Sequence, residues 1–474
     1  MSACKQTGSI PLVSLVNLGC PKNTVDSEGL LAGMSLAGFR FVEDPLEADV
    51  CLVNTCGFLD AARQEAQEVL EGLAAARGRR TRPILVATGC AVERAGGAPE
   101  LDDGFLDAAD LRVGFADYPR LPEICLGQLA VRPAKGYAGP HALPAAYIRW
   151  LSQPRMRIGA PWSAWLKLGE GCSNCCAYCA IPLIRGRRVS RPAAALLREA
   201  QQLVESGARE INLIAQDVTA YGLDALAAGG ALPKHRPFAA LVTEMLRCLP
   251  TSGIWLRVLY AHPRHLSNEI LDVLASDPRI CPYLDLPLQH VDSRVLRLMG
   301  RGYDRKRVDR LLAALRRRWP QMALRSTFIV GHPGETPQAF QTLLDFVREG
   351  HIDHLGVFEW SPEPGTRSMD LRAIRVDPQQ ASERRQQLME AQQAVSHRRL
   401  LARKGRVTEF LAERREGGHW VGRTPFQAPD IDGETRLDSS SPGTPPLHAG
   451  DLIPVRLTGS TAYDLTATRL KFKA

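Results

Sequence analysis

One short run of cysteines has the residue types and spacing to bind an iron–sulfur cluster. Cys172, Cys176 and Cys179 stand at the spacing C-x3-C-x2-C. Iron–sulfur clusters are usually held by four cysteine thiolates. Three thiolates would leave one iron open to a small molecule, as three protein ligands leave an open position in catalytic zinc sites.

A structural zinc site is the alternative for this run, because Cys175 offers a possible fourth thiolate. However, no second C-x2-C pair or histidine pair follows nearby to complete a zinc fold. Cys175 also breaks the usual chelating spacing. We therefore expect an open cluster with Cys175 as a spectator, and zinc stays as the alternative.

Three more cysteines occupy equivalent places, each just past an apolar run and next to a glycine: Cys20, Cys56 and Cys90. A single cysteine after a strand is usually a small buried apolar residue. Three at equivalent places are less readily explained in that way, and the glycines give the backbone room to approach a cluster. We expect a second cluster here, again with three ligands and one open iron. The cysteines without such a setting are expected to be structural: Cys4, Cys51, Cys125, Cys248 and Cys281.

Residues 9–130 alternate between apolar runs and helical patterns, and these elements would position the second set of cysteines. The apolar runs are Ile10–Asn17, Asp49–Asn54 and Pro83–Ala87, and the helical patterns are Thr24–Ala37 and Leu59–Ala76. Such alternation predicts an α/β domain with a doubly wound parallel sheet. Ligands of these sheets bind beyond the carboxyl ends of the strands, so cysteines far apart in sequence would meet there.

A central barrel is predicted to position the first set of cysteines. Residues 131–160 are rich in proline and glycine and are expected to be a linker. Residues 161–400 resume the alternation and predict a partial (β/α)6 TIM-like barrel, whose active site would lie at the strand carboxyl ends. Cys172 follows the first of its strands. The six expected strands are Trp165–Gly169, Glu210–Ala215, Trp255–Tyr260, Tyr283–Leu286, Leu324–Val330 and Leu355–Trp360.

The last part of the chain changes character. Asp377–Lys404 is a polar helical stretch rich in Gln and Arg, and we expect it to be a connector. Residues 403–474 contain short β-like runs broken by glycine and proline, which predict a small antiparallel β-barrel. These runs are Val407–Leu411, Trp420–Arg423, Asp451–Leu457 and Leu465–Leu470.

Composition narrows the class of protein. A chain of 474 residues with 45% hydrophobic and 23% charged residues is typical of a globular protein with two to four domains. No apolar run reaches membrane-spanning length, and Met1–Gly8 lacks a signal-peptide layout, so the cytoplasm is the expected location.

Twelve cysteines are too few in a chain of this length for a disulfide scaffold, so they are expected to be metal ligands or catalytic residues. The net charge of +8 allows an acidic partner such as a ribosome or RNA.

These motifs together resemble the radical S-adenosylmethionine (radical SAM) methylthiotransferases. The resemblance is carried by GCPKN at 19–23, NTCGF at 54–58, Gly89-Cys90, the C-x3-C-x2-C run and the final β-rich segment. It implies an auxiliary 4Fe-4S cluster in the N-terminal domain, a radical SAM barrel, and a C-terminal TRAM barrel that grips the substrate. S-adenosylmethionine would supply both a radical and a methyl group, because no general base removes hydrogen from an unactivated C–H bond.

The resemblance also implies roles for particular residues. Cys172, Cys176 and Cys179 would hold the cluster that cleaves S-adenosylmethionine, and Tyr178 matches the aromatic that packs on the adenine. Two further segments agree with the family and would lie near the cofactor: Gln216–Gly222, which begins with Gln216, and Phe328–Glu335, which contains Gly331 and Glu335.

Some positions in these segments depart from the family pattern or stay ambiguous. His332 replaces a usually apolar residue, and Val189 replaces an expected arginine. Arg185, Arg188 and Arg191 have the geometry to pair with a carboxylate. An exposed basic loop is the alternative for these three arginines.

Within the family, the sequence resembles the branch that modifies the β-carbon of an aspartate in ribosomal small-subunit protein twelve. That likeness rests on Pro287–His290, Gly422–Gly433 and Ala462–Leu465. From Arg403 onward eleven Lys or Arg stand against nine Asp or Glu, a net of +2, whereas an RNA-gripping module should be more basic. Acidic Asp430, Asp432 and Glu434 suit a basic protein loop better than phosphate, and solvated surface charges are the alternative.

Other functions remain open at this point. The first is the branch of the family that modifies an adenosine in transfer RNA. The second is a non-catalytic metal- or RNA-binding protein whose cysteines hold zinc. For the enzyme, the resemblance implies a flavodoxin- or ferredoxin-like electron donor, and RNA contact is possible.

Overall fold

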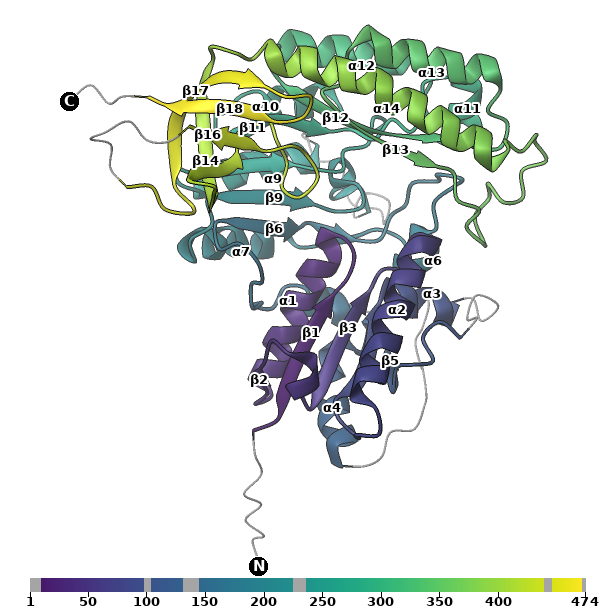
Figure 1. Cartoon of the computed structure of the whole chain (residues 1–474), viewed down its shortest axis with the longest axis vertical. Coiled ribbons are helices and arrows are strands. Elements are labelled where there is room, and N and C mark those ends of the chain that lie inside the picture. The colour runs from purple at the N-terminus through teal and green to yellow at the C-terminus, as the bar shows by residue number, and fades with distance from the viewer. Residues whose placement is uncertain (1–9, 98–103, 131–144, 225–235, 439–445, 471–474) are drawn as a thin grey trace, which may run out of the picture.

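The fold consists of two parallel sheets and a small closed barrel, placed side by side in Figure 1. The computed structural model describes residues 10–97, 104–130, 145–224, 236–438 and 446–470. Most of the expected linker (131–144) and Cys4 lie outside the described residues. The rest of that linker includes a short helix, α5 (Ala145–Trp150).

The N-terminal sheet has five strands, all paired in parallel, in the order β2-β1-β3-β4-β5. The three predicted apolar runs are confirmed as its central strands. The two short edge strands were not predicted. Their bounds are β1 (Leu12–Asn17), β2 (Arg40–Phe41), β3 (Val50–Thr55), β4 (Ile84–Gly89) and β5 (Leu111–Val113).

Helices pack on both faces of this sheet because alternate residues of each strand point to opposite sides. In β3, Leu52 joins the core that contains Leu30 of α1 (Pro21–Leu36). Its neighbour Val53 joins the other core, with Leu70 of α2 (Asp60–Arg77). Burial on both faces explains why the strands are continuous apolar runs in the sequence. The sheet is doubly wound, as predicted. The remaining helices of this part are α3 (Cys90–Gly97) and α4 (Leu121–Ala130).

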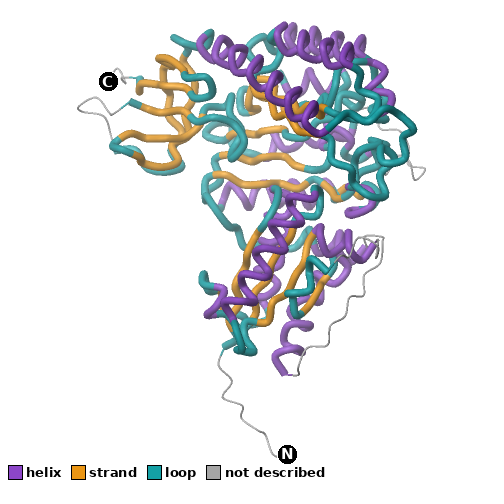
Figure 2. The backbone as a smooth tube through the Cα atoms, turned by 45° about the vertical axis from the view of Figure 1, so that its right-hand side comes forward, coloured by secondary structure: helices purple, strands orange, loops and turns teal. Residues whose placement is uncertain are grey.

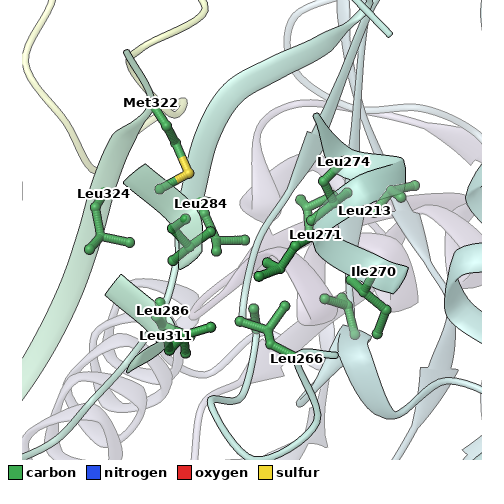
Figure 3. Close-up of a cluster of buried hydrophobic side chains, with 14 of the residues drawn as sticks. Leu213, Leu266, Ile270, Leu271, Leu274, Leu284, Leu286, Leu311, Met322 and Leu324 are labelled. Atoms are coloured by element: carbon green, nitrogen blue, oxygen red, sulfur yellow. The ribbon is translucent and has the colours of Figure 1, made fainter. Parts of the chain in front are cut away.

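The central part is an open sheet of six parallel strands in the order β13-β12-β11-β10-β9-β6, curved with its helices outside (Figures 1 and 2). All six predicted strands are confirmed within a few residues: β6 (Ser163–Lys167), β9 (Glu210–Ile214), β10 (Trp255–Val258), β11 (Ile280–Asp285), β12 (Ala323–Val330) and β13 (His354–Glu359). Leucines from strands and helices fill the space between these layers, among them Leu213, Leu271, Leu284 and Leu324 (Figure 3). The packed helices are α7 (Ala193–Glu205), α9 (Pro237–Cys248), α10 (Asn268–Leu274), α11 (Ser293–Leu298), α12 (Arg305–Arg318) and α13 (Pro337–Glu349).

The expected connector is a long helix, α14 (Pro378–Leu401), and it also packs on the barrel beside β13 and α13. Beyond it, five strands close a small barrel in the order β14-β15-β16-β18-β17. All pairs are antiparallel except β16–β18, which is parallel. Four of the strands were predicted and the three-residue β16 was not: β14 (Val407–Glu416), β15 (His419–Arg423), β16 (Thr435–Leu437), β17 (Leu452–Ser460) and β18 (Leu465–Arg469).

Buried ion pairs attach the small barrel to the amino ends of the central strands. Arg423 of β15 donates to both carboxylate oxygens of Glu210, the first residue of β9, at 3.0 and 2.7 Å. Arg257 of β10 donates to the same carboxylate at 2.8 Å. Two guanidinium groups outweigh the opposing effect of burial and lower the pKa of Glu210 to about 2.

Asp432 was expected to face a basic protein loop or the solvent, and the structure corrects this expectation. Its carboxylate is buried and accepts from the hydroxyl of Tyr283 at 2.7 Å and from Arg325 at 3.0 Å. It therefore serves the barrel interface and is neither a surface charge nor available to a substrate. Glu434 is paired with Arg414 at 2.6 Å at the surface.

None of the described helices is both long enough and apolar enough to cross a bilayer.

Removing Arg423 should strongly destabilise the attachment of the small barrel. Arg423→Ala leaves the Glu210 charge buried with one partner fewer, which should cost about 3–5 kcal/mol of the free energy of unfolding at pH 7. Because the pKa of Glu210 in the folded protein is lowered to about 2, from 4.5, the lost stabilisation is present above about pH 4.5 and disappears as the pH falls toward 2. Urea unfolding at several pH values measures this. An equal loss at pH 7 and pH 3 would contradict the assignment.

Candidate metal centres and cofactor site

The first three cysteines come together at the carboxyl edge of the N-terminal sheet, as predicted. Cys20 precedes α1, Cys56 follows β3, and Cys90 begins α3 directly after β4. The loops are close: a Cβ added at Gly19 would lie 3.0 Å from the Cβ of Cys56. One added at Gly57 would lie 2.7 Å from the carbonyl carbon of Cys90. Only residues without side chains permit this approach.

Asn23 holds together the three loops that carry Cys20, Cys56 and Cys90. Its amide nitrogen donates to the carbonyl of Thr55 at 2.9 Å and to that of Leu18 at 3.1 Å. Its amide oxygen lies 3.6 Å from the sulfur of Cys90. Asn54 donates to the Asn23 carbonyl at 2.9 Å. Each cysteine loop is thus fastened to the same asparagine.

The three thiols have different acidities. Burial raises the pKa of Cys56, and it raises the pKa of Cys90 to about 12, with the nearby Cys56 and Cys20 charges adding to the effect. For Cys20, burial is outweighed by Lys22, Arg185 and two backbone N–H groups, and its pKa is lowered. Since the thiolate is the metal ligand, Cys20 is the member of this set that ionises first.

The second set of cysteines lies in the loop after β6 and the short β7 (Gly169–Glu170), at the mouth of the barrel. The Cys172 N–H donates to the Gly186 carbonyl at 3.1 Å, and the Ala177 N–H donates to the Met299 carbonyl at 2.8 Å. A Cβ at Gly300 would lie 2.3 Å from the Cys175 carbonyl oxygen. The loop is therefore clamped against the segment after α11.

Arg301 reaches back from that segment to the loop. Its guanidinium donates to the sulfur of Cys176 at 3.2 Å and to the hydroxyl of Tyr178 at 3.1 Å. It also donates to the Pro287 carbonyl at 2.6 Å. Tyr178 is partly buried and packs against Val295 and Met299.

Arg185 connects the first set of cysteines with the segment that carries the second set. It ends α6 (Ile181–Arg185), which begins two residues after Cys179. Its guanidinium donates to the sulfur of Cys90 at 3.1 Å and to Asn23 at 2.6 Å. The same group pairs with Asp26 of α1 at 3.1 Å and Glu170 of β7 at 2.8 Å.

Of the two possibilities that the sequence left open for these arginines, the structure shows carboxylate pairing, and an exposed basic loop is wrong. The partner carboxylates belong to the chain itself. Arg191 is buried and pairs with Glu199 at 2.5 Å, and Arg188 lies 3.8 Å from Asp217.

The residues present fit the implied clusters. In each set, one buried arginine donates to one cysteine sulfur, and such a donor stabilises a thiolate that binds iron. Among the described residues, the three possible metal ligands whose atoms all lie within 4.8 Å of one another are Asp217, His262 and His265. In neither set of cysteines do all three sulfurs lie this close together. Thiolates that bind different irons of one cluster need not approach as closely as those around a single ion.

The barrel mouth also fits a polar cofactor. Several buried polar atoms there have no hydrogen-bond partner, and all follow the carboxyl ends of β9 to β12. A polar ligand would satisfy them, since such atoms are costly when unpaired. They are Gln216 Oε1, His262 Nε2, Gln289 Oε1, His290 Nε2 and Glu335 Oε1.

The structure shows where the other predicted cofactor residues lie. Gln216 donates to Glu170 at 2.7 Å, so it is tied to the Arg185 network. Glu335 accepts from the backbone N–H of Gly331 and pairs with Arg384 of α14 at 3.0 Å. Gly331 and Glu335 are thus adjacent. The other oxygen of Glu335, Oε1, accepts no hydrogen bond and lies 3.5 Å from Nε2 of His290.

His332 and Cys175, which were singled out in the sequence, have contacts that do not point to a role in the chemistry. His332 is buried between the Ser368 hydroxyl (2.8 Å) and the Pro333 carbonyl (3.0 Å), and burial lowers its pKa to about 4. Cys175 has an exposed side chain, while its carbonyl accepts from Arg367. Three of the other cysteines, Cys51, Cys125 and Cys281, are buried, and Cys248 is partly buried.

Sequence reasoning missed the buried charges that surround Arg185. Lys167 and Glu170 form an ion pair, and Lys167 also lies 2.7 Å from Asp26. Tyr147 of α5 donates to Glu170 at 3.0 Å. A glutamate two residues before Cys172 was the one available signal, because charged residues at the end of a buried strand are unusual.

Sequence reasoning also did not predict a role for Asp217, which contacts the loop that carries the second set of cysteines. Asp217 accepts from Asn174, between Cys172 and Cys176, at 2.8 Å. It also lies 2.7 Å from the ring of His265. Hydrogen bonding and nearby positive charge outweigh burial and lower the pKa of Asp217, so it stays ionised beside the loop.

Comparison with family models agrees with this arrangement. The chain matches the Radical SAM superfamily over residues 166–347, "Uncharacterized protein family UPF0004" over 13–106 and the TRAM domain over 405–470. The radical S-adenosylmethionine methyltransferase TsrM from Kitasatospora setae has a similar fold, with a TM-score of 0.53 and 14% identity over 74% of this chain and 73% of that one. Fold and site together define a radical SAM enzyme with an additional cysteine-bearing domain.

Curated relatives narrow the class further. The ribosomal protein uS12 methylthiotransferase RimO of Symbiobacterium thermophilum is 39% identical, over 96% of this chain and 90% of that protein. The RimO protein of Trichlorobacter lovleyi is 38% identical, over 97% of this chain and 98% of that protein. The chain belongs to the RimO family of radical SAM methylthiotransferases.

Replacing Arg185 should disturb both cysteine sets. Arg185→Met leaves Asp26 and Glu170 with Lys167 as their remaining buried cation, which should cost about 3–5 kcal/mol of the free energy of unfolding. It should also lower the iron content, because Cys90 loses its donor. Arg185→Lys should be intermediate, since one ammonium cannot reach all four partners.

The exposed neighbour Arg187 provides the matched control. Arg187→Met should change neither urea unfolding nor the iron content of anaerobically reconstituted protein. Equal behaviour of the Arg185 and Arg187 variants would contradict the bridging role.

Proposed function

We propose that this protein methylthiolates the β-carbon of an aspartate in ribosomal small-subunit protein twelve (uS12). The relatives are named for that ribosomal protein. The observation that carries the proposal is the pair of cysteine sets joined by the buried Arg185. Sulfur insertion and radical generation need two centres near one substrate, and this arrangement supplies them.

The six cysteines are the proposed ligands. Cys172, Cys176 and Cys179 would hold one 4Fe-4S cluster, and Cys20, Cys56 and Cys90 the other. When bound, S-adenosylmethionine and the two clusters supply the radical, the sulfur and the methyl group. The chain's own contribution is to hold the thiolates in place and to present Arg301 and Arg185 to them.

Tyr178, Gln216, Gly331 and Glu335 are the proposed cofactor contacts. Buried oxygens of Gln216 and Glu335 that accept no hydrogen bond support this, as does the position of Tyr178 beside Cys176.

Partners follow from the same proposal. The substrate would be the ribosomal protein, free or on the ribosome, and the TRAM barrel would contact it or the nearby RNA. An electron donor of flavodoxin or ferredoxin type would reduce the clusters. The reaction would take place in the cytoplasm.

Substitution of single cysteines separates the two centres. Cys176→Ala should abolish cleavage of S-adenosylmethionine, since its open cluster loses a ligand. Cys56→Ala should permit cleavage to 5′-deoxyadenosine but stop sulfur insertion. Cys175→Ala, at the exposed position, is the control and should retain both activities.

Product and metal analysis are the readouts for these variants. Methylthiolated product from the Cys56 variant would show that the two-cluster assignment is wrong. Zinc without sulfide in anaerobically purified wild-type protein would refute the clusters altogether.

A deletion strain identifies the substrate. Mass spectrometry should show that uS12 lacks its methylthio group, while methylthio-adenosine in digested transfer RNA is unchanged. Loss of the modified adenosine with intact uS12 modification would assign the protein to the transfer-RNA branch instead.

A further inference from the structure

Lys22 carries a buried positive charge that is not paired with a carboxylate among the described residues, although the Cys20 thiol lies nearby. Its side chain is only 9% exposed, and its ammonium lies 3.2 Å from the centroid of the Tyr260 ring. Among the residues that the structure describes, no carboxylate or hydrogen-bond acceptor pairs with this ammonium. Lysine is almost never buried without a partner, and its ammonium can donate three hydrogen bonds.

The position of Lys22 places this charge between the two centres. It stands in the first turn of α1, two residues after Cys20. Tyr260 follows β10 at the mouth of the barrel and holds a left-handed backbone, with φ of 61°. A left-handed tyrosine is strained, and here it presents its ring to Lys22. The contact therefore spans the N-terminal sheet and the barrel.

The nearest acidic groups already have other partners. Asp285 of β11 accepts from the Tyr260 N–H at 3.0 Å and lies 3.8 Å from Arg325. Glu170 is paired with Lys167 and Arg185. Cys20 is the remaining nearby group that can carry a negative charge. No carboxylate of the described residues pairs with Lys22, so its ammonium can still bind one from a ligand.

We propose that Lys22 binds the side-chain carboxylate of the substrate aspartate and so selects an acidic residue for modification. This inference rests on the proposed function. An ammonium held on an aromatic face beside Cys20 would place the carboxylate next to the auxiliary centre. A single buried cation suits one carboxylate, whereas a nucleic-acid backbone needs a row of exposed ones.

The test compares two synthetic peptides of the uS12 target loop, one with the target aspartate and one with asparagine in its place. The enzymes are wild type, Lys22→Met, Lys22→Arg and the exposed control Lys306→Met. For the aspartate peptide, Lys22→Met should raise KM by about 30-fold or more, because a desolvated charge pair loses one partner. Its kcat should change much less, and the preference for aspartate over asparagine should vanish.

Two further measurements distinguish recognition from structure. Iron and sulfide content, and 5′-deoxyadenosine formed without peptide, should be unchanged in Lys22→Met. Lys22→Arg should keep part of the aspartate preference, and Lys306→Met should match wild type. Loss of iron in Lys22→Met would assign Lys22 to cluster binding and overturn the inference.

The outcomes also separate this inference from the proposed function. An unchanged KM and an unchanged aspartate preference in Lys22→Met would refute the role of Lys22 while the methylthiolation stands. If wild-type enzyme modifies neither peptide nor intact uS12, the proposed function itself fails.

Discussion

The buried guanidinium of Arg185 is the interaction on which the rest of the arrangement depends. One planar group contacts the sulfur of Cys90, the amide of Asn23 and two carboxylates, from Asp26 and Glu170. Only arginine offers five donors in a fixed fork for such a task. Because Arg185 ends the short helix α6, which follows Cys179, the segment that carries the second set of cysteines is connected to the first set through this side chain.

Charge balance explains why this network is tolerated in the interior of the protein. Lys167 and Arg185 carry two positive charges, and Asp26 and Glu170 carry two negative ones. Burial opposes ionisation, but the two cations outweigh it and lower the pKa of Glu170. A neutral set of four charges with satisfied hydrogen bonds is the condition under which buried ions persist. The same network fixes the angle between the N-terminal sheet and the barrel, since its members come from both.

The sequence predicts the sheets and the cysteine positions well, because both depend on local patterns. The first four residues of β3, from Val50 to Val53, are apolar since both faces of the strand are buried, and Cys56 directly follows its carboxyl end. Short edge strands such as Arg40–Phe41 have too few residues to show a pattern.

Polar contacts between residues far apart in the sequence could not be predicted from local patterns. Arg301 reaches Cys176 from 125 residues away. Asp432 looks like a surface acid in the sequence and is instead buried beside Tyr283. Whether a charge is buried depends on which distant segment covers it, and no periodicity in the sequence encodes that.

The small barrel contacts Glu210, the first residue of β9, through Arg423, and the Pro425 carbonyl accepts from Arg257 of β10 at 2.9 Å. The second set of cysteines lies past the opposite, carboxyl end of the neighbouring strand β6. β9 has five residues, and a strand of that length spans about 16 Å. The attachment of the small barrel and the second set of cysteines therefore lie about one strand length apart. A partner that touched both places at once would have to bridge that length of the sheet.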